Sequence, residues 1–139
     1  MKLQGLLKGD FVEFGAGKAG LSSFIAQSAE KESTFLVIER EARRKKKDKD
    51  IRACGFPLAR ETMDIKDFDL TKTALKSVIG VAKHLCGGAT DLTLTSFAHS
   101  HEQMKGVAIA TCCHHACDTK SYVNLDYVEN ELGISLEKF

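Results

Sequence analysis

The feature that most constrains this sequence is a glycine-rich turn between an apolar strand and an apolar helix. The strand is predicted over Asp10–Phe14, and the turn carries a G-x-G-x-x-G pattern formed by Gly15, Gly17 and Gly20. A helix is expected from about Leu21, because apolar or small residues recur there at the spacing of one helical face: Leu21, Phe24, Ile25 and Ser28. The pattern alone is weak evidence of function, since a glycine turn between a strand and a helix can lack a ligand.

Strands and helices alternate along the rest of the chain. Further strands are predicted over 35–38, over a short run ending at Met63-Asp64, over 77–82 and over 107–110, and helices over 89–100 and 121–132. The charged stretch 41–58 lacks periodicity and is predicted to be a basic loop or a fraying helix. This alternation predicts one α/β domain over 1–139, with a Rossmann-like parallel sheet that binds ligands at the carboxyl ends of its strands.

Three acidic residues at successive strand ends indicate which cofactor such a site would take. Glu13 lies two residues before the first glycine, where it would repel the pyrophosphate of a dinucleotide but attract the positive groups of S-adenosylmethionine. Glu39 can accept hydrogen bonds from ribose hydroxyls, and Asp64 with Ile65 suits an adenine ring. Taken singly, Glu39 could be an ordinary exposed carboxylate and Asp64 a helix cap. Together they predict a methyl-donor site.

A second group of polar residues follows the strand 77–82. Lys83 and His84 stand where a reacting group would face the donor, and both residue types can accept or polarise a proton near neutral pH. The Asn/Asp-Pro-Pro-aromatic motif of enzymes that methylate base amines is absent, so a hydroxyl is the favoured acceptor. The alternative for Lys83 is a surface lysine.

The strand 107–110 runs into the dense motif Cys112-Cys113-His114-His115-x-Cys117. Adjacent residues that leave a strand point to opposite faces, so these side chains are not expected to converge on a metal without help from Cys86, His84 or another chain. No metal site is therefore predicted, with structural zinc as the alternative. His114 or His115 is expected to face the substrate as a proton acceptor.

Composition adds few constraints. The net charge is +1, but basic residues gather over 43–49, where they could contact RNA phosphates or form a solvated loop. Five cysteines, an odd number, suit reduced thiols and an intracellular protein, cytoplasmic or nuclear. No apolar run is long enough to span a membrane.

Several of these motifs together resemble one family closely. They are the Phe11–Gly17 strand and turn, Asp64–Asp67, Lys83–Gly87 with Ala89–Leu92, and Cys112–Cys117. The chain resembles, from about Phe11 to Phe139, the eukaryotic tRNA 2′-O-methyltransferases that modify the fourth nucleotide of the acceptor stem (the TRM thirteen type). In that family a glycine usually stands at the position of Ala19.

The resemblance implies a class I methyltransferase fold and methyl transfer from S-adenosylmethionine to a ribose 2′-hydroxyl of tRNA. It assigns the reaction face to Lys83, His84 and the stretch Cys113–His115, with Lys83, His114 and His115 as the catalytic candidates. It assigns the donor site to Glu13, Gly15, Ala16, Gly17, Glu39, Arg40, Asp64, Ile65, His84 and Leu85.

The resemblance also raises an expectation about the limits of the domain. A complete sheet of this class has seven strands, and only five are predicted here, so the last two are expected to be missing. Strand 107–110 would then be an apolar edge that a partner or a missing C-terminal segment covers. The alternatives are an inactive RNA- or zinc-binding remnant and a nicotinamide-dependent oxidoreductase.

Overall fold

A computed structural model describes residues 8–42, 45–113 and 116–138. Five parallel strands form one sheet in the order β3-β2-β1-β4-β5. The strands are β1 Asp10–Phe14, β2 Phe35–Glu39, β3 Leu58–Thr62, β4 Val78–Cys86 and β5 Met104–Cys112. The α-helices are α1 Gly20–Ile25, α2 Asp48–Ala53 and α3 Ala89–His99. Short helical turns are η1 Ile65–Asp67, η2 Leu70–Lys72, η3 His101–Gln103, the π-helical η5 Tyr127–Glu131 and η6 Leu136–Lys138.

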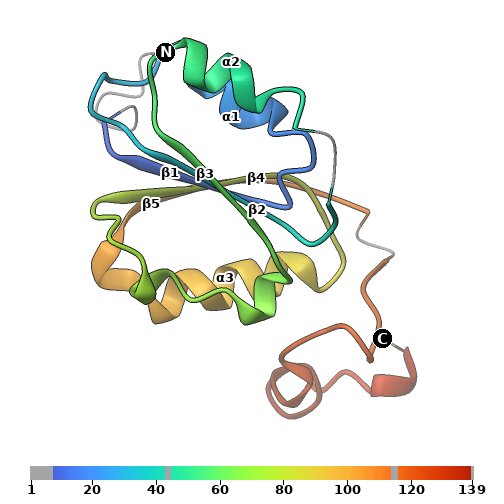
Figure 1. The fold of residues 1–139 in the computed structure, drawn as a ribbon. Coiled ribbons are helices and arrows are strands. Elements are labelled where there is room, and N and C mark those ends of the chain that lie inside the picture. Colours follow the sequence, from blue (N-terminus) through green and yellow to red (C-terminus); the bar gives the residue numbers. More distant parts are fainter. Residues whose placement is uncertain (1–7, 43–44, 114–115, 139) are drawn as a thin grey trace.

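The sheet lies between two helical layers. Helices α1 and α2 cover one face and α3 covers the other, as Figure 1 shows. The central strands are buried on both faces, which explains why their sequences are almost uninterrupted apolar runs. On the α1 face Phe11 stacks on Phe35 with ring centroids 5.1 Å apart, and on the α3 face Phe14 meets Phe97 edge-on at 5.0 Å.

Gly80 in β4 allows α3 to pack closely against the sheet. A Cβ atom at this position would lie only 2.1 Å from the ring of Phe97. The ring therefore occupies the space above the glycine and brings α3 over the middle of the sheet. The order of the predicted elements is confirmed, with strands and helices alternating as expected.

Several predicted boundaries were wrong. β4 does not end at Ala82 but continues through Cys86, because β5 pairs with it along that whole length. Of the two alternatives for the stretch 41–58, a loop or a fraying helix, the structure has a short helix in part of it: α2, whose Ile51 is fully buried. Phe24 does not lie on the buried face of α1 but is 72% exposed.

The last predicted helix is also shorter than expected. Instead of a helix over 121–132, the chain turns at Asn124, whose side-chain oxygen accepts the Tyr127 N–H at 3.3 Å. A π-helical turn follows, in which the Leu132 N–H reaches the Tyr127 carbonyl at 3.0 Å. Val128 is buried while Leu132 stays exposed, so only part of the predicted apolar face is used.

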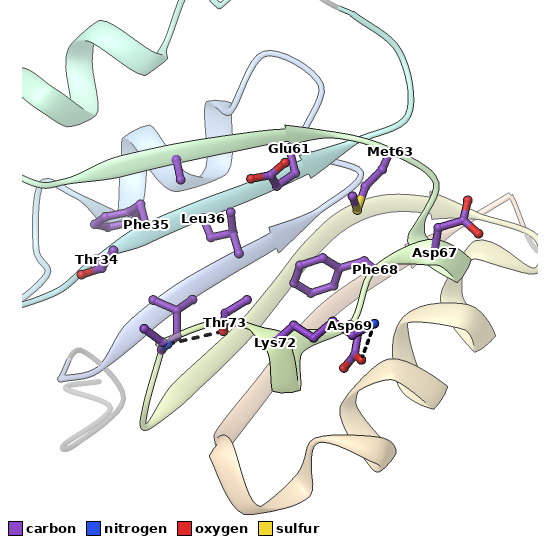
Figure 2. A pocket seen from close by; sticks show the side chains of 13 residues that line it. Thr34, Phe35, Leu36, Glu61, Met63, Asp67, Phe68, Asp69, Lys72 and Thr73 are labelled. Carbon is purple, nitrogen blue, oxygen red and sulfur yellow. Dashed lines mark hydrogen bonds and ion pairs between the residues drawn. The ribbon is translucent and has the colours of Figure 1, made fainter.

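A pocket of about 390 Å³ lies on the α3 face beside β2 and β3. Figure 2 shows that its side chains come from these strands and from the segment after β3, with Leu36, Met63 and Phe68 around the same space. Its lining shares no residue with the cavities at the carboxyl ends of the strands described below. Among the described residues, no helix has the length and apolar character needed to cross a membrane.

Candidate functional site

The candidate site lies where the strand order reverses. β1 has β2 on one side and β4 on the other, so the chain crosses in opposite directions from this point of the sheet. In open parallel sheets the loops diverge there and leave a crevice. Two adjoining cavities, of about 730 Å³ and about 560 Å³, occupy this edge and share Gly15, Gly17 and His84 in their linings.

The glycine loop needs its glycines for backbone geometry. Gly15 and Gly17 have φ angles of +61° and +52°, a region that side chains disfavour. A Cβ atom at Gly15 would also lie 2.8 Å from the Leu85 side chain of β4. Ala19 has a φ of +60° too, a conformation that a glycine would adopt without strain.

Glu13 is a buried carboxylate directly below this loop. Glu13 is only 4% exposed, and its Oε2 accepts the N–H of Ser22 in α1 at 2.9 Å. Burial raises the pKa of Glu13, while hydrogen bonds from Ser22 and the charge of Arg60 act in the opposite direction. The side chain lines the smaller cavity, so a cationic ligand group there would restore favourable surroundings for its negative charge.

Glu39 ends β2 and closes the other side of the loop. Its Oε2 accepts the Gly17 N–H at 2.6 Å, and its Oε1 accepts the Glu41 N–H at 3.2 Å. Glu39 and Arg40 both line the larger cavity. Each carboxylate oxygen has a second lone pair, so the group can also accept hydrogen bonds from a diol.

An ion pair that sequence analysis missed supports the loop from below. Arg60 in β3 donates to both carboxylate oxygens of Asp48 in α2, at 2.9 Å and 2.6 Å, and to the Gly17 carbonyl at 3.1 Å. The two side chains are 6% and 3% exposed. The only sequence signal was an aspartate in the first turn of a helix. Because basic residues surround Asp48 in the sequence, the segment was interpreted from its positive charge and the aspartate was not singled out.

Asp64 and Ile65 follow β3 and line the larger cavity. Asp64 caps the turn η1, since its Oδ1 accepts the Lys66 N–H at 3.1 Å. The capping role considered from the sequence is therefore real. It does not remove Asp64 from the cavity, because the carboxylate has a second oxygen.

The end of β4 carries a β-bulge at His84. Lys83 pairs with Ala110 and Leu85 with Thr111, which leaves His84 as an extra residue with a φ of +62°. Lys83 lines the smaller cavity beside Glu13, and His84 lines both cavities. Leu85 is 3% exposed and forms part of the floor.

The segment after β5 closes the larger cavity on the side where α3 begins. A Cβ atom at Gly87 would lie 2.6 Å from the Ala116 carbonyl oxygen, and one at Gly88 only 2.0 Å from that of Ser121. These two glycines therefore admit the backbone of 116–121 against the start of α3 (Figure 1). Lys120 and Ser121 join the lining, which sequence analysis had not predicted.

A group of thiols marks the same edge. The Sγ atoms of Cys86 and Cys112 lie 3.3 Å apart, and Cys86 also lines the larger cavity. The hydrogen bond with Cys86, together with desolvation and the neighbouring Cys113, raises the pKa of the Cys112 thiol to about 12. Burial and the charges of Asp91 and Asp118 raise the pKa of Cys117.

The two cavities contain the ten residues predicted to hold the donor and also Lys83. His114 and His115 lie outside the described residues. The donor set fits S-adenosylmethionine chemically: a desolvated carboxylate for a cation, an acceptor carboxylate for a ribose, and an apolar side chain beside an acid for adenine.

The fold and this edge define a class I methyltransferase domain. The crystal structure of the CurJ carbon methyltransferase has a similar fold, with a TM-score of 0.53 and 19% sequence identity. The similarity covers 95% of this chain and 34% of the CurJ chain.

Sequence comparison gives the particular family. The chain belongs to the family described as Methyltransferase TRM13, which matches residues 1–139. The resemblance inferred from the motifs is thereby confirmed.

Curated proteins from several eukaryotes are similar to most of this chain. The tRNA:m(4)X modification enzyme TRM13 of Vanderwaltozyma polyspora is 34% identical over 89% of this chain and 34% of its own length. The homologue from Dictyostelium discoideum is 37% identical over 93% of this chain and 27% of its own. The human homologue is 30% identical over 93% of this chain and 37% of its own. The chain thus spans about a third of the length of these relatives.

Proposed function

We propose that the protein transfers a methyl group from S-adenosylmethionine to a ribose 2′-hydroxyl in the acceptor stem of tRNA. The observation that carries the proposal is the buried Glu13 beneath a glycine loop at the switch point of a methyltransferase sheet. Relatives that match most of this chain are named as tRNA modification enzymes. S-adenosylmethionine would supply a methyl group that is already activated by a positively charged sulfur.

The donor would be held by groups on three strands. Glu13 faces the smaller cavity and suits a cationic group of the donor, since its carboxylate is desolvated and lacks a full counter-charge. Glu39 is oriented by the Gly17 N–H and suits the two ribose hydroxyls. Asp64 and Ile65 line the larger cavity, where an amino group and a ring face could be bound.

Lys83 is the described residue best placed to act on the acceptor hydroxyl. It stands at the end of β4 on the wall of the smaller cavity, on the same side of the sheet as Glu13. An ammonium there can polarise the hydroxyl, and a neutral amine or a histidine from 114–115 can accept the proton that the hydroxyl must lose. Most of the rate enhancement would come from positioning the two reactants in line.

Ligand specificity separates the proposal from a nicotinamide-dependent oxidoreductase. A thermal-shift titration should show stabilisation by S-adenosylhomocysteine and none by NAD. The Glu13→Ala variant should lose most of this stabilisation, whereas Glu61→Ala, an exposed acid outside both cavities, should keep it. Stabilisation by NAD alone would exclude a methyl-donor site.

Activity separates the proposal from an inert remnant. Labelled methyl from S-adenosylmethionine should appear in tRNA as a 2′-O-methyl nucleotide after nuclease digestion, and Lys83→Ala should reduce it by about tenfold to a hundredfold or more. Donor binding by the Lys83→Ala variant should be retained. Binding of the donor without any methylation of tRNA would show that this chain is not an active enzyme.

A further inference from the structure

Three cysteine thiols lie close together at the carboxyl edge of the sheet. Cys86 ends β4, Cys112 ends β5 and Cys113 is the next residue after β5. The Sγ atoms of Cys86, Cys112 and Cys113 all lie within 4.8 Å of one another. Among the described residues, this is the one group of three or more cysteine, histidine or acidic side chains close enough to share an ion. All five cysteines are free thiols, so none of the three is committed to a disulfide.

Two backbone irregularities create this convergence. In β4 the extra residue His84 reverses the alternation of side chains, so that Cys86 pairs in register with Cys112 on the same face of the sheet. Without the bulge, Cys86 would point to the opposite face.

The second irregularity is at Cys113. Its φ of +49° is a left-handed conformation that residues other than glycine rarely adopt. This turn breaks the strand alternation that would separate the thiols of Cys112 and Cys113. The expectation that adjacent cysteines leaving β5 cannot converge was therefore wrong for this pair, and Cys86 is the third residue that a metal site required.

The geometry matches the demands of a thiolate-bound zinc ion. A Zn–S bond of about 2.3 Å in a tetrahedron places the sulfur atoms about 3.8 Å apart. The observed spread, from 3.3 Å between two of the atoms to less than 4.8 Å among all three, encloses that value. Cys86 and Cys113 are exposed and Cys112 is half-buried, so an ion can enter from solvent.

We propose that Cys86, Cys112 and Cys113 bind one Zn²⁺ ion through three thiolates, with water in the fourth position. The ion would join the carboxyl ends of β4 and β5, directly beside the larger cavity that Cys86 also lines. Thiolates are soft ligands that bind zinc, whereas magnesium and calcium bind oxygen ligands. The metal site is distinct from the proposed methyl transfer in its chemistry, because none of its three thiols is proposed to bind the donor or to take a proton from the acceptor.

Metal content tests the proposal directly. Protein purified under reducing conditions and incubated with Zn²⁺ should retain about one zinc per chain after desalting, as measured by inductively coupled plasma mass spectrometry. Replacing zinc with Co²⁺ should give the strong sulfur-to-cobalt absorption of a thiolate site. Cys86→Ser, Cys112→Ser and Cys113→Ser should each reduce the cobalt absorption and weaken zinc affinity by at least tenfold, while Cys54→Ser, an exposed cysteine at the end of α2, should change neither.

Thiol accessibility gives a second readout. All five cysteines should react with Ellman's reagent in the presence of a chelator, and the number of reactive thiols should fall by three when zinc is bound. Circular dichroism of each variant establishes that it is folded, and the exposed Cys113 offers a variant that should not disturb the core.

Three results would overturn the zinc site. The first is that reduced, folded protein retains no zinc. The second is that Cys54→Ser loses as much metal as the variants of the three proposed ligands. The third is that Cys86 and Cys112 form a disulfide in place of metal binding, detected by mass spectrometry as the loss of two hydrogens. Zinc binding without donor binding would count against the proposed function alone. Donor binding without zinc would count against the metal site alone.

Discussion

At the scale of single residues, the buried carboxylate of Glu13 leads to a prediction about both stability and the proposed donor binding. We expect Glu13→Gln to raise the free energy of unfolding, because it removes a desolvated charge but keeps an oxygen to accept the Ser22 N–H. The same variant should bind S-adenosylhomocysteine about tenfold more weakly, a loss of about 1.4 kcal/mol. Thermal unfolding and isothermal titration calorimetry measure the two effects, with Glu61→Gln as the matched control. Unchanged affinity would remove Glu13 from the donor site.

The pH dependence of this effect has a definite sign. Burial raises the pKa of Glu13 above 4.5, so the folded state binds its proton more tightly than the unfolded state. The ionised group therefore costs stability above its folded pKa, and this cost disappears as the pH falls toward 4.5. The stability difference between Glu13→Gln and the original protein should shrink over that range. Donor affinity should weaken over the same range in the original protein only.

The buried pair of Arg60 and Asp48 gives a second test at this scale. Arg60→Met should destabilise the protein by about 3–5 kcal/mol, because it leaves the Asp48 carboxylate buried without its partner. The double variant with Asp48→Leu should recover most of that loss in urea unfolding. Its donor affinity should stay reduced, because the Gly17 carbonyl has lost its hydrogen bond.

An exposed ion pair provides the control for this test. Lys72 and Asp69 form a pair at 3.3 Å in which the lysine side chain is 82% exposed. Lys72→Met should therefore change stability by less than about 1 kcal/mol. If Arg60→Met costs no more than Lys72→Met, the buried pair does not support the loop.

Spacing along the chain predicted some site residues and missed others for physical reasons. Glu13, Glu39 and Asp64 could be found because each follows a parallel strand, and the ends of such strands meet at one edge. Arg60 could not be found, because it lies inside an edge strand and its partner is twelve residues earlier in a different element. Long-range ion pairs leave no periodic signal.

At the scale of elements, the β-bulge in β4 places His84 in the lining of both cavities. His84 adopts a φ of +62° and is exposed, so its backbone is strained while its side chain contributes little to the core. We expect His84→Gly to raise the free energy of unfolding by about 1 kcal/mol, since glycine tolerates this conformation. His84→Ala keeps the strain and should not show the gain. Both variants should weaken donor binding equally if the imidazole contacts the donor, as measured by calorimetry.

The predicted element boundaries were wrong where polar residues continue a strand or where a side chain ends a helix. Lys83 and His84 made β4 seem to end at Ala82, although the strand continues to Cys86 and three of these four further residues pair with β5. The side chain of Asn124 accepts a hydrogen bond from the Tyr127 N–H, and only a short π-helical turn begins there. The periodicity of this segment had predicted a longer helix. Neither pairing partners nor caps are visible in hydrophobic periodicity alone.

At the scale of the whole molecule, the two helical layers leave the carboxyl edge of the sheet open, and the proposed donor site lies there. The glycine loop, the bulge and the thiol group all lie there, and the basic run leaves the sheet from the same edge after Glu39. β5 forms one border of the described sheet, with Val107 47% exposed. A net charge of +1 gives little overall attraction for RNA, so the proposed binding of tRNA would depend on where the cations gather.

The basic run therefore predicts how binding to tRNA depends on salt. Lys45, Lys46 and Lys49 are exposed and line neither donor cavity, so replacing all three with glutamine should weaken tRNA binding and leave the affinity for S-adenosylhomocysteine unchanged. Each lost phosphate contact should lower the slope of log affinity against log salt by about 0.7–0.9. Fluorescence anisotropy with labelled tRNA across a salt series measures that slope.

A second triple variant separates local contacts from total charge. Lys31, Lys72 and Lys76 are equally exposed but lie away from the basic run, so their replacement removes the same charge. We expect this control to change the slope by much less than the first variant, because counterions are released only where phosphates contact cations. Equal slopes in the two variants would mean that tRNA responds to net charge, and the basic run would then be a solvated segment beside the donor site.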